Sequence, residues 1–196
     1  LIGSAAEYGA KSSEELPIPE SATTFPANDY GKSKLIQTMI GLQAYQQWGL
    51  PVMIARTFNL LGSGMPSHLA PKIFLQQINK VKAGFSDQIL TGPLHSQRDF
   101  LDVRDAVKAY WDLLENGKPG EIYNVCSSTP TSMLTLLMRM CEISGLKDFN
   151  ILSEGQESKR SSHVDISYGS NQKILGHTGW SPNISLDEAI ANLVRT

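Results

Sequence analysis

The segment PVMIARTF, residues 51–58, is the sequence feature that most constrains the fold. It is an almost unbroken apolar run, which is typical of a strand buried on both faces in a parallel sheet. A long helix is expected just before it, because apolar residues recur every three or four positions from about Asp29, and Gly49 with Pro51 ends that pattern. Parallel strands need helical crossovers of this kind. The segment and its preceding helix therefore predict an α/β fold.

The same alternation continues along the chain. The first residues, LIGS, are typical of the end of a buried strand, and EIYNVC, residues 121–126, predicts a further strand. Helices are expected before and after that strand, and each ends at a glycine, Gly117 or Gly145. Near the end of the chain, Ser185 and Glu188 have the spacing of a capping box that opens a last short helix. Strands separated by helices favour the α/β class.

Composition and charge exclude several classes of partner. The 196 residues carry a formal net charge of −2 with scattered lysines and arginines, so no nucleic-acid surface is expected. No apolar run approaches the length of a membrane span, and no signal segment is recognisable. Cys126 and Cys141 lie in apolar contexts and are expected to be buried thiols, and the four histidines lack metal-ligand spacing. A cytoplasmic protein without a metal site, a membrane partner or a nucleic-acid partner is therefore expected.

Tyr30 and Lys34, in the segment YGKSK, lie one helical turn apart on the same face of the predicted helix. The positive charge of the lysine would favour the phenolate form of the tyrosine, which suits proton exchange with an alcohol or carbonyl oxygen. Ser4, at the end of the first predicted strand, offers a short hydroxyl to the same oxygen. Together these residues indicate hydride-transfer chemistry. The tyrosine–lysine spacing by itself is also that of an ordinary solvated helix face.

The order of these features resembles the extended short-chain dehydrogenase/reductases, in particular the NAD-dependent epimerase/dehydratase family that works on nucleotide sugars. The blocks that carry the resemblance span essentially the whole chain: SAAEYG, YGKSK, ARTFNLLGSG, QRDFLDVRDAVKAYW, GEIYNVCSS and TGWSPNISLDEAI. Within the family, the blocks RTFN, RDFLDVRD and YNVCS look most like the GDP-6-deoxy-D-mannose (GDP-4-keto-6-deoxy-mannose) reductases.

The resemblance implies the C-terminal portion of a Rossmann-type parallel sheet plus a smaller substrate-binding domain. Residues 1–60 would form the last part of the NAD(P)-binding domain and carry the catalytic residues. Residues 61–196 would form mainly the nucleotide-sugar domain, with one strand and helix, about residues 98–126, returning towards the Rossmann part. The family's N-terminal glycine-rich turn is expected to be missing, since GSGMPS, residues 62–67, lacks the third glycine and the later acidic residue. NAD(P) would then be bound mainly by the missing N-terminal segment.

The resemblance also implies roles for individual residues. Ser4 would orient the sugar carbonyl, Tyr30 would donate the proton, and Lys34 would hold the nicotinamide ribose and tune the tyrosine. Tyr30 and Lys34 thereby also belong to the cofactor site. Phe58 would lie near the nicotinamide, although core packing explains a phenylalanine there equally well. Asn59, a polar residue directly after a buried strand, would bind the substrate.

Two arginines complete the expected substrate site. Arg98 in QRDF and Arg160 in SKRSSHVD match nucleotide- or phosphate-contacting arginines of the family, and a guanidinium suits a phosphate because it pairs in a bidentate way. A surface arginine without a role is the alternative for each. Arg160 lies in the polar stretch 153–170, which is a surface loop or part of a binding site, and composition favours the loop.

Departures from the family pattern shape the expected activity. Where the 4,6-dehydratases carry a glutamate two residues after the catalytic serine or threonine, this chain has Ala6, which cannot remove the proton that water elimination requires. Ser161, His163, Pro93 and His95 replace residues more usual in the reductases, which leaves the nucleotide and the sugar open. We expect an NAD(P)H-dependent reductase of a nucleotide-linked 4-keto-6-deoxy sugar, GDP-4-keto-6-deoxy-D-mannose in particular. A nucleotide-sugar 4-epimerase and a non-catalytic nucleotide-sugar-binding protein are the alternatives.

The resemblance further implies a homodimer through the helix that contains Tyr30. The far side of this helix would present Ile40, Tyr45 and Trp48 to a second subunit, and the helix after Gly64 is expected to join it in a four-helix arrangement. The choice between NADH and NADPH is not encoded in these residues, because it depends on the glycine-rich half of the cofactor domain. Little activity is therefore expected of this chain by itself.

Overall fold

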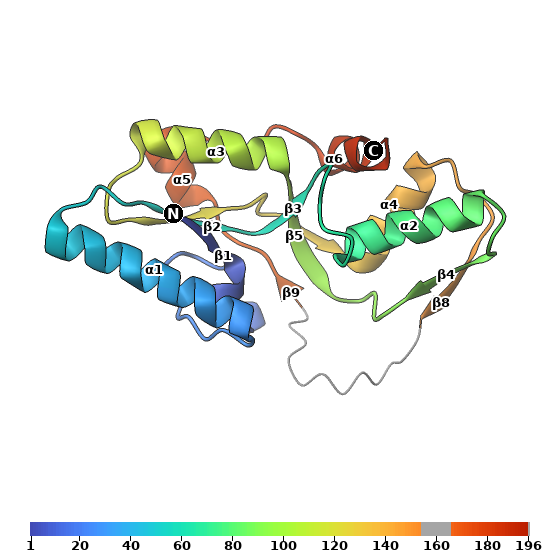
Figure 1. Ribbon diagram of the computed structural model, residues 1–196, viewed down its shortest axis with the longest axis horizontal. Coiled ribbons are helices and arrows are strands. Elements are labelled where there is room, and N and C mark those ends of the chain that lie inside the picture. The colour runs from blue at the N-terminus through green and yellow to red at the C-terminus, as the bar shows by residue number, and fades with distance from the viewer. Residues whose placement is uncertain (154–165, 196) are drawn as a thin grey trace.

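The computed structural model describes residues 1–153 and 166–195, whose strands form three sheets (Figure 1). A parallel sheet has the order β1-β2-β6 and consists of β1 (Ile2–Ser4), β2 (Ile54–Thr57) and β6 (Ile122–Val125). A mixed sheet consists of β3 (Asn59–Leu61), β5 (Gln97–Asp102), β7 (Pro130–Ser132) and β9 (Ile166–Ser167). In it β7 alone runs antiparallel to β5. The third sheet pairs β4 (Gln88–Thr91) with β8 (Asn150–Ser153) in parallel.

Helices surround these sheets. The α-helices of the described residues are α1 (Asp29–Trp48), α2 (Ala70–Lys82), α3 (Val103–Asn116), α4 (Met133–Ile143), α5 (Gln172–Thr178) and α6 (Leu186–Val194). Two short 3-10 helices, η1 (Ala5–Glu7) and η2 (Ser13–Glu15), follow β1. Figure 1 shows α1 on one side of the parallel sheet and α3 with α5 on the other. None of these helices combines the length and the apolar character that crossing a membrane requires.

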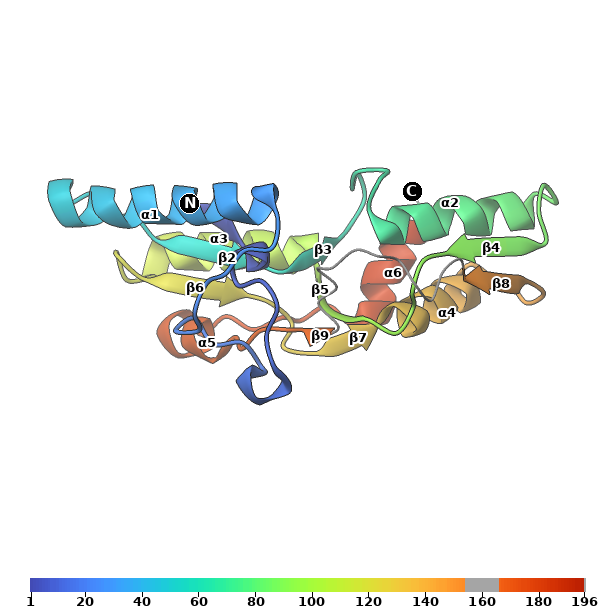
Figure 2. The ribbon, with the colours of Figure 1, turned by 90° about the horizontal axis from the view of Figure 1, so that it is seen from below.

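The molecule is elongated, and α1 and α2 lie at its opposite ends in both views (Figures 1 and 2). Helix α2 packs on α4 and β4, in the other half of the molecule from α1. The four-helix arrangement expected of α1 and the helix after Gly64 at a dimer interface stays a prediction.

The structure confirms the α/β fold that the sequence predicts, and one predicted strand is shorter than expected. Helix α1 begins after Asn28, whose side-chain oxygen accepts a hydrogen bond from the Gly31 amide at 2.8 Å, and ends at Gly49 with a φ of 67°. The predicted strand over residues 51–58 pairs only from Ile54 to Thr57. Pro51 has no amide hydrogen to donate, and the amide after it bonds back to the Leu50 carbonyl.

Strands β4, β7, β8 and β9 are elements that the sequence pattern does not reveal. β4 and β8 have four residues, β7 has three and β9 has two, and such runs carry too little periodicity to be recognised. At α6, the Ser185 hydroxyl accepts from the Glu188 amide at 3.2 Å, as the capping spacing predicts. The Glu188 carboxylate itself lies 3.4 Å from the Arg104 guanidinium, so only the serine half of the predicted capping box is seen.

Helix α1 is buried through small residues. Its buried positions are Gly31, Thr38, Gly41 and Ala44. Four of its large apolar side chains face outward, each more than half exposed: Ile36, Met39, Ile40 and Trp48. Leu35 and Leu42 are partly buried. Much of the apolar pattern that predicts this helix thus lies on its exposed side, and the small residues let its axis approach the sheet closely.

The closest approach occurs at Gly31, between Tyr30 and Lys34. A Cβ atom there would lie 2.5 Å from the Ala6 carbonyl oxygen and 2.9 Å from the Cβ of Pro26. The first turn of α1 therefore packs directly on η1, which follows Ser4. This contact determines how near the tyrosine and the serine can come.

Three buried clusters form the core. One lies between the parallel sheet and helices α3 and α5 and includes Tyr123 and Trp180. A second fills the half of the molecule around α2, α4 and α6. A third, small cluster below β1 contains Phe58 and Cys126. Cys126 and Cys141 are both free and buried, as their apolar contexts predict.

We expect Gly31→Ala to lower the free energy of unfolding by about 1–3 kcal/mol, because the added methyl group overlaps backbone that cannot move independently. Denaturant unfolding of the intact protein measures this change. Gly176→Ala is the matched control, since Gly176 lies inside α5 with no atom within 4 Å of its added Cβ. We expect that control to be neutral or stabilising. Equal stabilities for the two variants would contradict a tight contact between α1 and η1.

Candidate active site

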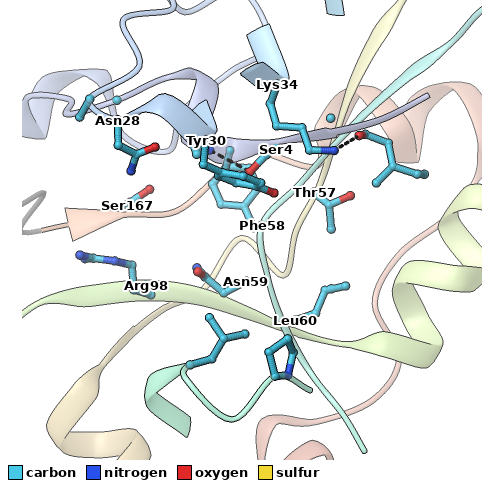
Figure 3. Close-up of a pocket in the computed structure, with 18 of the residues that line it drawn as sticks. Ser4, Asn28, Tyr30, Lys34, Thr57, Phe58, Asn59, Leu60, Arg98 and Ser167 are labelled. Atoms are coloured by element: carbon cyan, nitrogen blue, oxygen red, sulfur yellow. Dashed lines mark hydrogen bonds between the residues drawn. The ribbon is translucent and has the colours of Figure 1, made fainter. Parts of the chain in front are cut away.

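A cavity of about 780 Å³ lies where β1, α1, β2, β5 and β9 meet (Figure 3). Six of the predicted site residues line it: Ser4, Tyr30, Lys34, Phe58, Asn59 and Arg98. Arg160, with Ser161 and His163, lies outside the described residues. The structure thus brings together residues that are up to 94 positions apart in the sequence, since Ser4 and Arg98 share one cavity.

Ser4 is held at the point where β1 ends and η1 begins. Its Oγ accepts a hydrogen bond from the Ala6 amide at 3.2 Å, and its own amide donates to the Glu7 carboxylate at 2.9 Å. The side chain is the N-cap of η1 and reaches the cavity although the residue is only 7% exposed. A hydroxyl that accepts one hydrogen bond can still donate its own hydrogen. Ser4 can therefore act as a donor to a ligand oxygen.

Tyr30 and Lys34 come from the first two turns of α1. Tyr30 is 57% exposed, so its phenol is accessible to a ligand. The Lys34 ammonium donates to the Ile2 carbonyl at 3.0 Å (Figure 3). It also donates to the Gln37 side chain at 3.1 Å. These bonds hold the ammonium against the end of β1. The predicted action of this ammonium on the Tyr30 phenol stays a prediction.

Phe58 and Asn59 follow β2 directly. Phe58 is 5% exposed, and its ring fills the space beside Gly169, where an added Cβ would lie 2.6 Å from it. Phe58 therefore packs in the core and also lines the cavity, and its place near a nicotinamide stays a prediction. Asn59 is exposed in the cavity, and its Nδ2 donates to the Asp99 carbonyl at 2.9 Å. Its amide oxygen can still accept a hydrogen bond.

Arg98 stands on β5, across the cavity from Tyr30 (Figure 3). Its Nη1 donates to the Gln97 carbonyl at 2.7 Å. Ser167, on the neighbouring strand β9, is its register partner and also lines the cavity. Of the polar stretch 153–170, the described end therefore contributes to the cavity wall and is more than a surface loop.

The next residue, Asp99, is completely buried and connects three segments behind the cavity. Its carboxylate accepts from the amide and the hydroxyl of Ser127, each at 2.7 Å, from the Ser128 amide at 3.0 Å and from the Gly169 amide at 3.3 Å. Burial raises the pKa of Asp99, and these hydrogen bonds oppose that effect. The carboxylate ties β5 to the segments that follow β6 and β9, and so it holds both strands at the cavity.

The cavity wall also contains two hydroxyls, those of Thr57 and Tyr110, that the sequence pattern does not predict as site residues. The Thr57 hydroxyl and the Tyr110 phenol lie 2.7 Å apart. Burial raises the pKa of Tyr110, while the bond to Thr57 lowers it and the nearby Tyr30 phenol raises it further. Both residues lie in blocks that carry the family resemblance, Thr57 in RTFN and Tyr110 in QRDFLDVRDAVKAYW, but neither block shows that the two meet. Their contact forms only when α3 reaches the cavity in the folded chain.

The cavity offers different chemistry at its two ends. Hydroxyl donors and an ammonium, from Ser4, Tyr30 and Lys34, gather on the α1 side, and a guanidinium and an amide, from Arg98 and Asn59, gather on the β5 side (Figure 3). Such an arrangement suits a ligand with a carbonyl or alcohol at one end and anionic groups at the other. Within the described residues, no group of three or more His, Cys, Asp and Glu side chains is arranged to hold a metal ion.

Comparison with known proteins agrees with this geometry. Residues 1–193 match the family model described as GDP-mannose 4,6 dehydratase. GDP-6-deoxy-D-mannose reductase of Pseudomonas aeruginosa is 30% identical over 190 residues, which cover 96% of this chain and 62% of that protein. UDP-glucose 4-epimerase of Streptococcus mutans is 29% identical over 202 residues, which cover 95% of this chain and 59% of that protein.

Among solved structures, that of RMD from Pseudomonas aeruginosa complexed with NADPH superposes with a TM-score of 0.93 at 29% identity. The match covers 99% of this chain and 64% of that chain, so this chain spans about 60% of the length of such relatives. These matches confirm the family resemblance that the sequence blocks indicate. The chain therefore belongs to the GDP-mannose 4,6-dehydratase family, within the NAD-dependent epimerase/dehydratase group of short-chain dehydrogenase/reductases.

Proposed function

We propose that the intact protein is an NAD(P)H-dependent reductase that converts GDP-4-keto-6-deoxy-D-mannose to GDP-6-deoxy-mannose. The observation that carries this proposal is the meeting of Ser4, Tyr30 and Lys34 in one cavity with Asn59 and Arg98. In the proposed reductase, residues 1–60 supply the catalytic groups and residues 61–196 mainly bind the nucleotide sugar.

In this proposal Tyr30 is the acid. Its phenol gives a proton to the oxygen of the 4-keto group while the carbon of that group receives a hydride, so the ketone becomes an alcohol. Ser4 donates a hydrogen bond to the same oxygen and orients it. Lys34 stabilises the phenolate that remains.

The residues present fit a nicotinamide cofactor. Phe58 offers an apolar surface at the cavity for the ring, and the Lys34 ammonium, held at the end of β1, is a donor for ribose hydroxyls. When bound, the reduced nicotinamide supplies the hydride. The dinucleotide would be held mainly by a glycine-rich segment of the intact protein, as in the family pattern.

At the other end of the cavity, Arg98 and Asn59 are the proposed partners of the substrate. The guanidinium suits a diphosphate, and the amide suits a phosphate or a sugar hydroxyl. The choice of GDP is supported by the similarity to GDP-6-deoxy-D-mannose reductase. Arg160 is proposed as a second nucleotide contact on the family pattern alone.

A nucleotide-sugar 4-epimerase is the second candidate. It would use Ser4, Tyr30 and Lys34 to oxidise one carbon and reduce it again, and the similarity to UDP-glucose 4-epimerase favours it. Dehydration is disfavoured, because Ala6 lines the cavity where a dehydratase carries an acidic residue, and a methyl group cannot move a proton.

A homodimer through α1 is also proposed. Its exposed residues include Ile36, Met39 and Ile40, which neighbour one another on the helix surface, and Trp48 about two turns further on, each more than half exposed. Contiguous apolar side chains of this kind usually mark an interaction site, and a two-fold axis would place the same face of a second copy on them.

For the acid, we expect Tyr30→Phe in the intact protein to lower kcat by about 10²- to 10⁴-fold with little change in KM, because the phenol acts on the transition state. Steady-state kinetics with a reduced cofactor measure both constants. Tyr45→Phe is the matched control, since Tyr45 stands on the same helix outside the cavity. Turnover of Tyr30→Phe close to that of wild type would end the assignment of Tyr30 as the acid.

For the reaction, we expect one NADPH or NADH to be oxidised for each molecule of GDP-4-keto-6-deoxy-D-mannose converted, because the product keeps the hydride. Absorbance at the nicotinamide band, together with product analysis, gives this ratio. An epimerase returns the hydride to the sugar and consumes no net cofactor. Conversion of a UDP- or dTDP-hexose to its 4-epimer without net oxidation would replace the reductase assignment by the epimerase one.

For the dimer, we expect Ile40→Glu to shift the intact protein from dimer to monomer, because a carboxylate would be buried without a partner at the two-fold interface. Light scattering over a range of concentrations measures the mass. Phe85→Glu is the control, since Phe85 is 85% exposed and follows α2 at the far end of the molecule. A wild-type protein that is monomeric at high concentration contradicts the proposed dimer.

A further inference from the structure

We propose that Glu7 is a positioning residue, which holds Ser4 in register with the helix that carries Tyr30 and Lys34. Glu7 does not line the cavity, and none of its side chain is exposed. Its role rests on the proposed function of Ser4, Tyr30 and Lys34. Glu7 lies inside the block SAAEYG, but the family resemblance assigns it no role.

The Glu7 carboxylate joins the three elements that supply the reacting groups. Its Oε1 accepts from the Ser4 amide at 2.9 Å, and its Oε2 accepts from the Thr38 hydroxyl at 2.9 Å and from the Arg56 Nε at 2.8 Å. Ser4 ends β1, Thr38 lies one turn after Lys34 in α1, and Arg56 lies in β2 two residues before Phe58. The Glu7 side chain therefore fixes the end of β1, helix α1 and strand β2 relative to one another.

The surrounding backbone leaves room for this carboxylate. A Cβ atom on Gly3, the residue before Ser4, would lie 2.7 Å from the Glu7 Oε1. The Arg56 guanidinium is held in turn over the Tyr8 ring, 4.7 Å from its centroid. The glycine, the stacked guanidinium and the three hydrogen bonds describe a site built around one orientation of the Glu7 carboxylate.

The stability of the fold does not by itself require a charged pair at the positions of Glu7 and Arg56. Glu7 and Arg56 side chains are 0% and 4% exposed, and burying such a pair costs about as much desolvation free energy as its attraction returns. Apolar residues of similar volume often stabilise a core equally well or better. The charged pair instead fixes the geometry, because each hydrogen bond restricts both the distance and the angle of its partner. Ser4 needs such a fixed position if it is to orient a substrate oxygen.

The sharpest variant is Thr38→Val in the intact protein. It keeps the shape of the side chain, removes the hydroxyl that bonds Glu7 to α1, and leaves the Ser4 and Arg56 bonds in place. We expect kcat per folded enzyme to fall by roughly 10-fold to 10²-fold with KM nearly unchanged, because a displacement of about 1 Å between reacting groups costs up to 10²-fold.

A second variant removes the carboxylate itself. Since Glu7→Gln would leave the buried Arg56 guanidinium without its partner, the double variant Glu7→Leu/Arg56→Met removes both charges and keeps the volume. The Ser4 amide and the Thr38 hydroxyl lose their acceptor, so we expect the free energy of unfolding to fall. We expect kcat per folded enzyme to fall by about 10²-fold, and this loss is separate from the loss of stability because only folded enzyme is counted.

Asp105→Asn is the matched control for a buried carboxylate outside the cavity. Asp105 is 5% exposed and accepts from the amides of Asn183 and Ile184 at 3.0 and 2.9 Å. We expect this variant to lose stability and to keep its kcat per folded enzyme. Wild-type kcat in Thr38→Val and in the double variant, or an equal loss in Asp105→Asn, would overturn the positioning role of Glu7.

Hydrogen exchange does not depend on catalytic activity, so it tests the positioning role of Glu7 separately from the proposed function. The Ser4 amide donates to Glu7, so its hydrogen exchange, followed by NMR, should speed up at least about 10-fold in the double variant while the amides of α4 keep their rates. Unchanged exchange at Ser4 refutes the positioning role. If wild type converts no nucleotide sugar, the proposed function fails, and the exchange rates still decide whether Glu7 holds Ser4.

Discussion

The contact between the first turn of α1 and the turn after β1 is the constraint on which the cavity depends. Gly31 allows the helix backbone to approach the Ala6 carbonyl to a distance that no side chain would tolerate. Because Tyr30 directly precedes Gly31 and Ser4 lies two residues before Ala6, the approach of the backbones also brings the phenol and the hydroxyl to one wall of the cavity. The helix is buried through small residues for the same reason.

Two completely buried carboxylates hold the two walls. Glu7 joins β1, α1 and β2 through Ser4, Thr38 and Arg56, and Asp99 joins β5 to the segments after β6 and β9. Each carboxylate offsets the free-energy cost of its burial by accepting hydrogen bonds from several segments. None of these segments can shift without breaking some of those hydrogen bonds. The cavity lies between these two supports, which makes its shape a property of the long-range hydrogen bonds around it.

Relatives of this chain are named as reductases, dehydratases and epimerases, which indicates that one cavity can serve several reactions. The groups that exchange a proton with a sugar oxygen are common to the proposed reductase and epimerase reactions. Under the proposed function, Ala6 in η1 disfavours dehydration, since a methyl group cannot remove a proton. The proposal thus rests on individual side chains at the cavity, because the fold by itself does not select one reaction.

The sequence by itself determined the α/β class, a start of α1 near Asp29 and its end at Gly49, and six residues that line the cavity, among them Ser4, Tyr30 and Arg98. These features are local or belong to recognisable blocks, so they can be found without coordinates. Only the tertiary structure decided that Glu7 meets Arg56, 49 positions away, that Tyr110 reaches Thr57, and that the apolar side of α1 stays exposed. Hydrogen bonds and burial between distant segments depend on how helices and strands pack, and no periodicity along the chain records that packing.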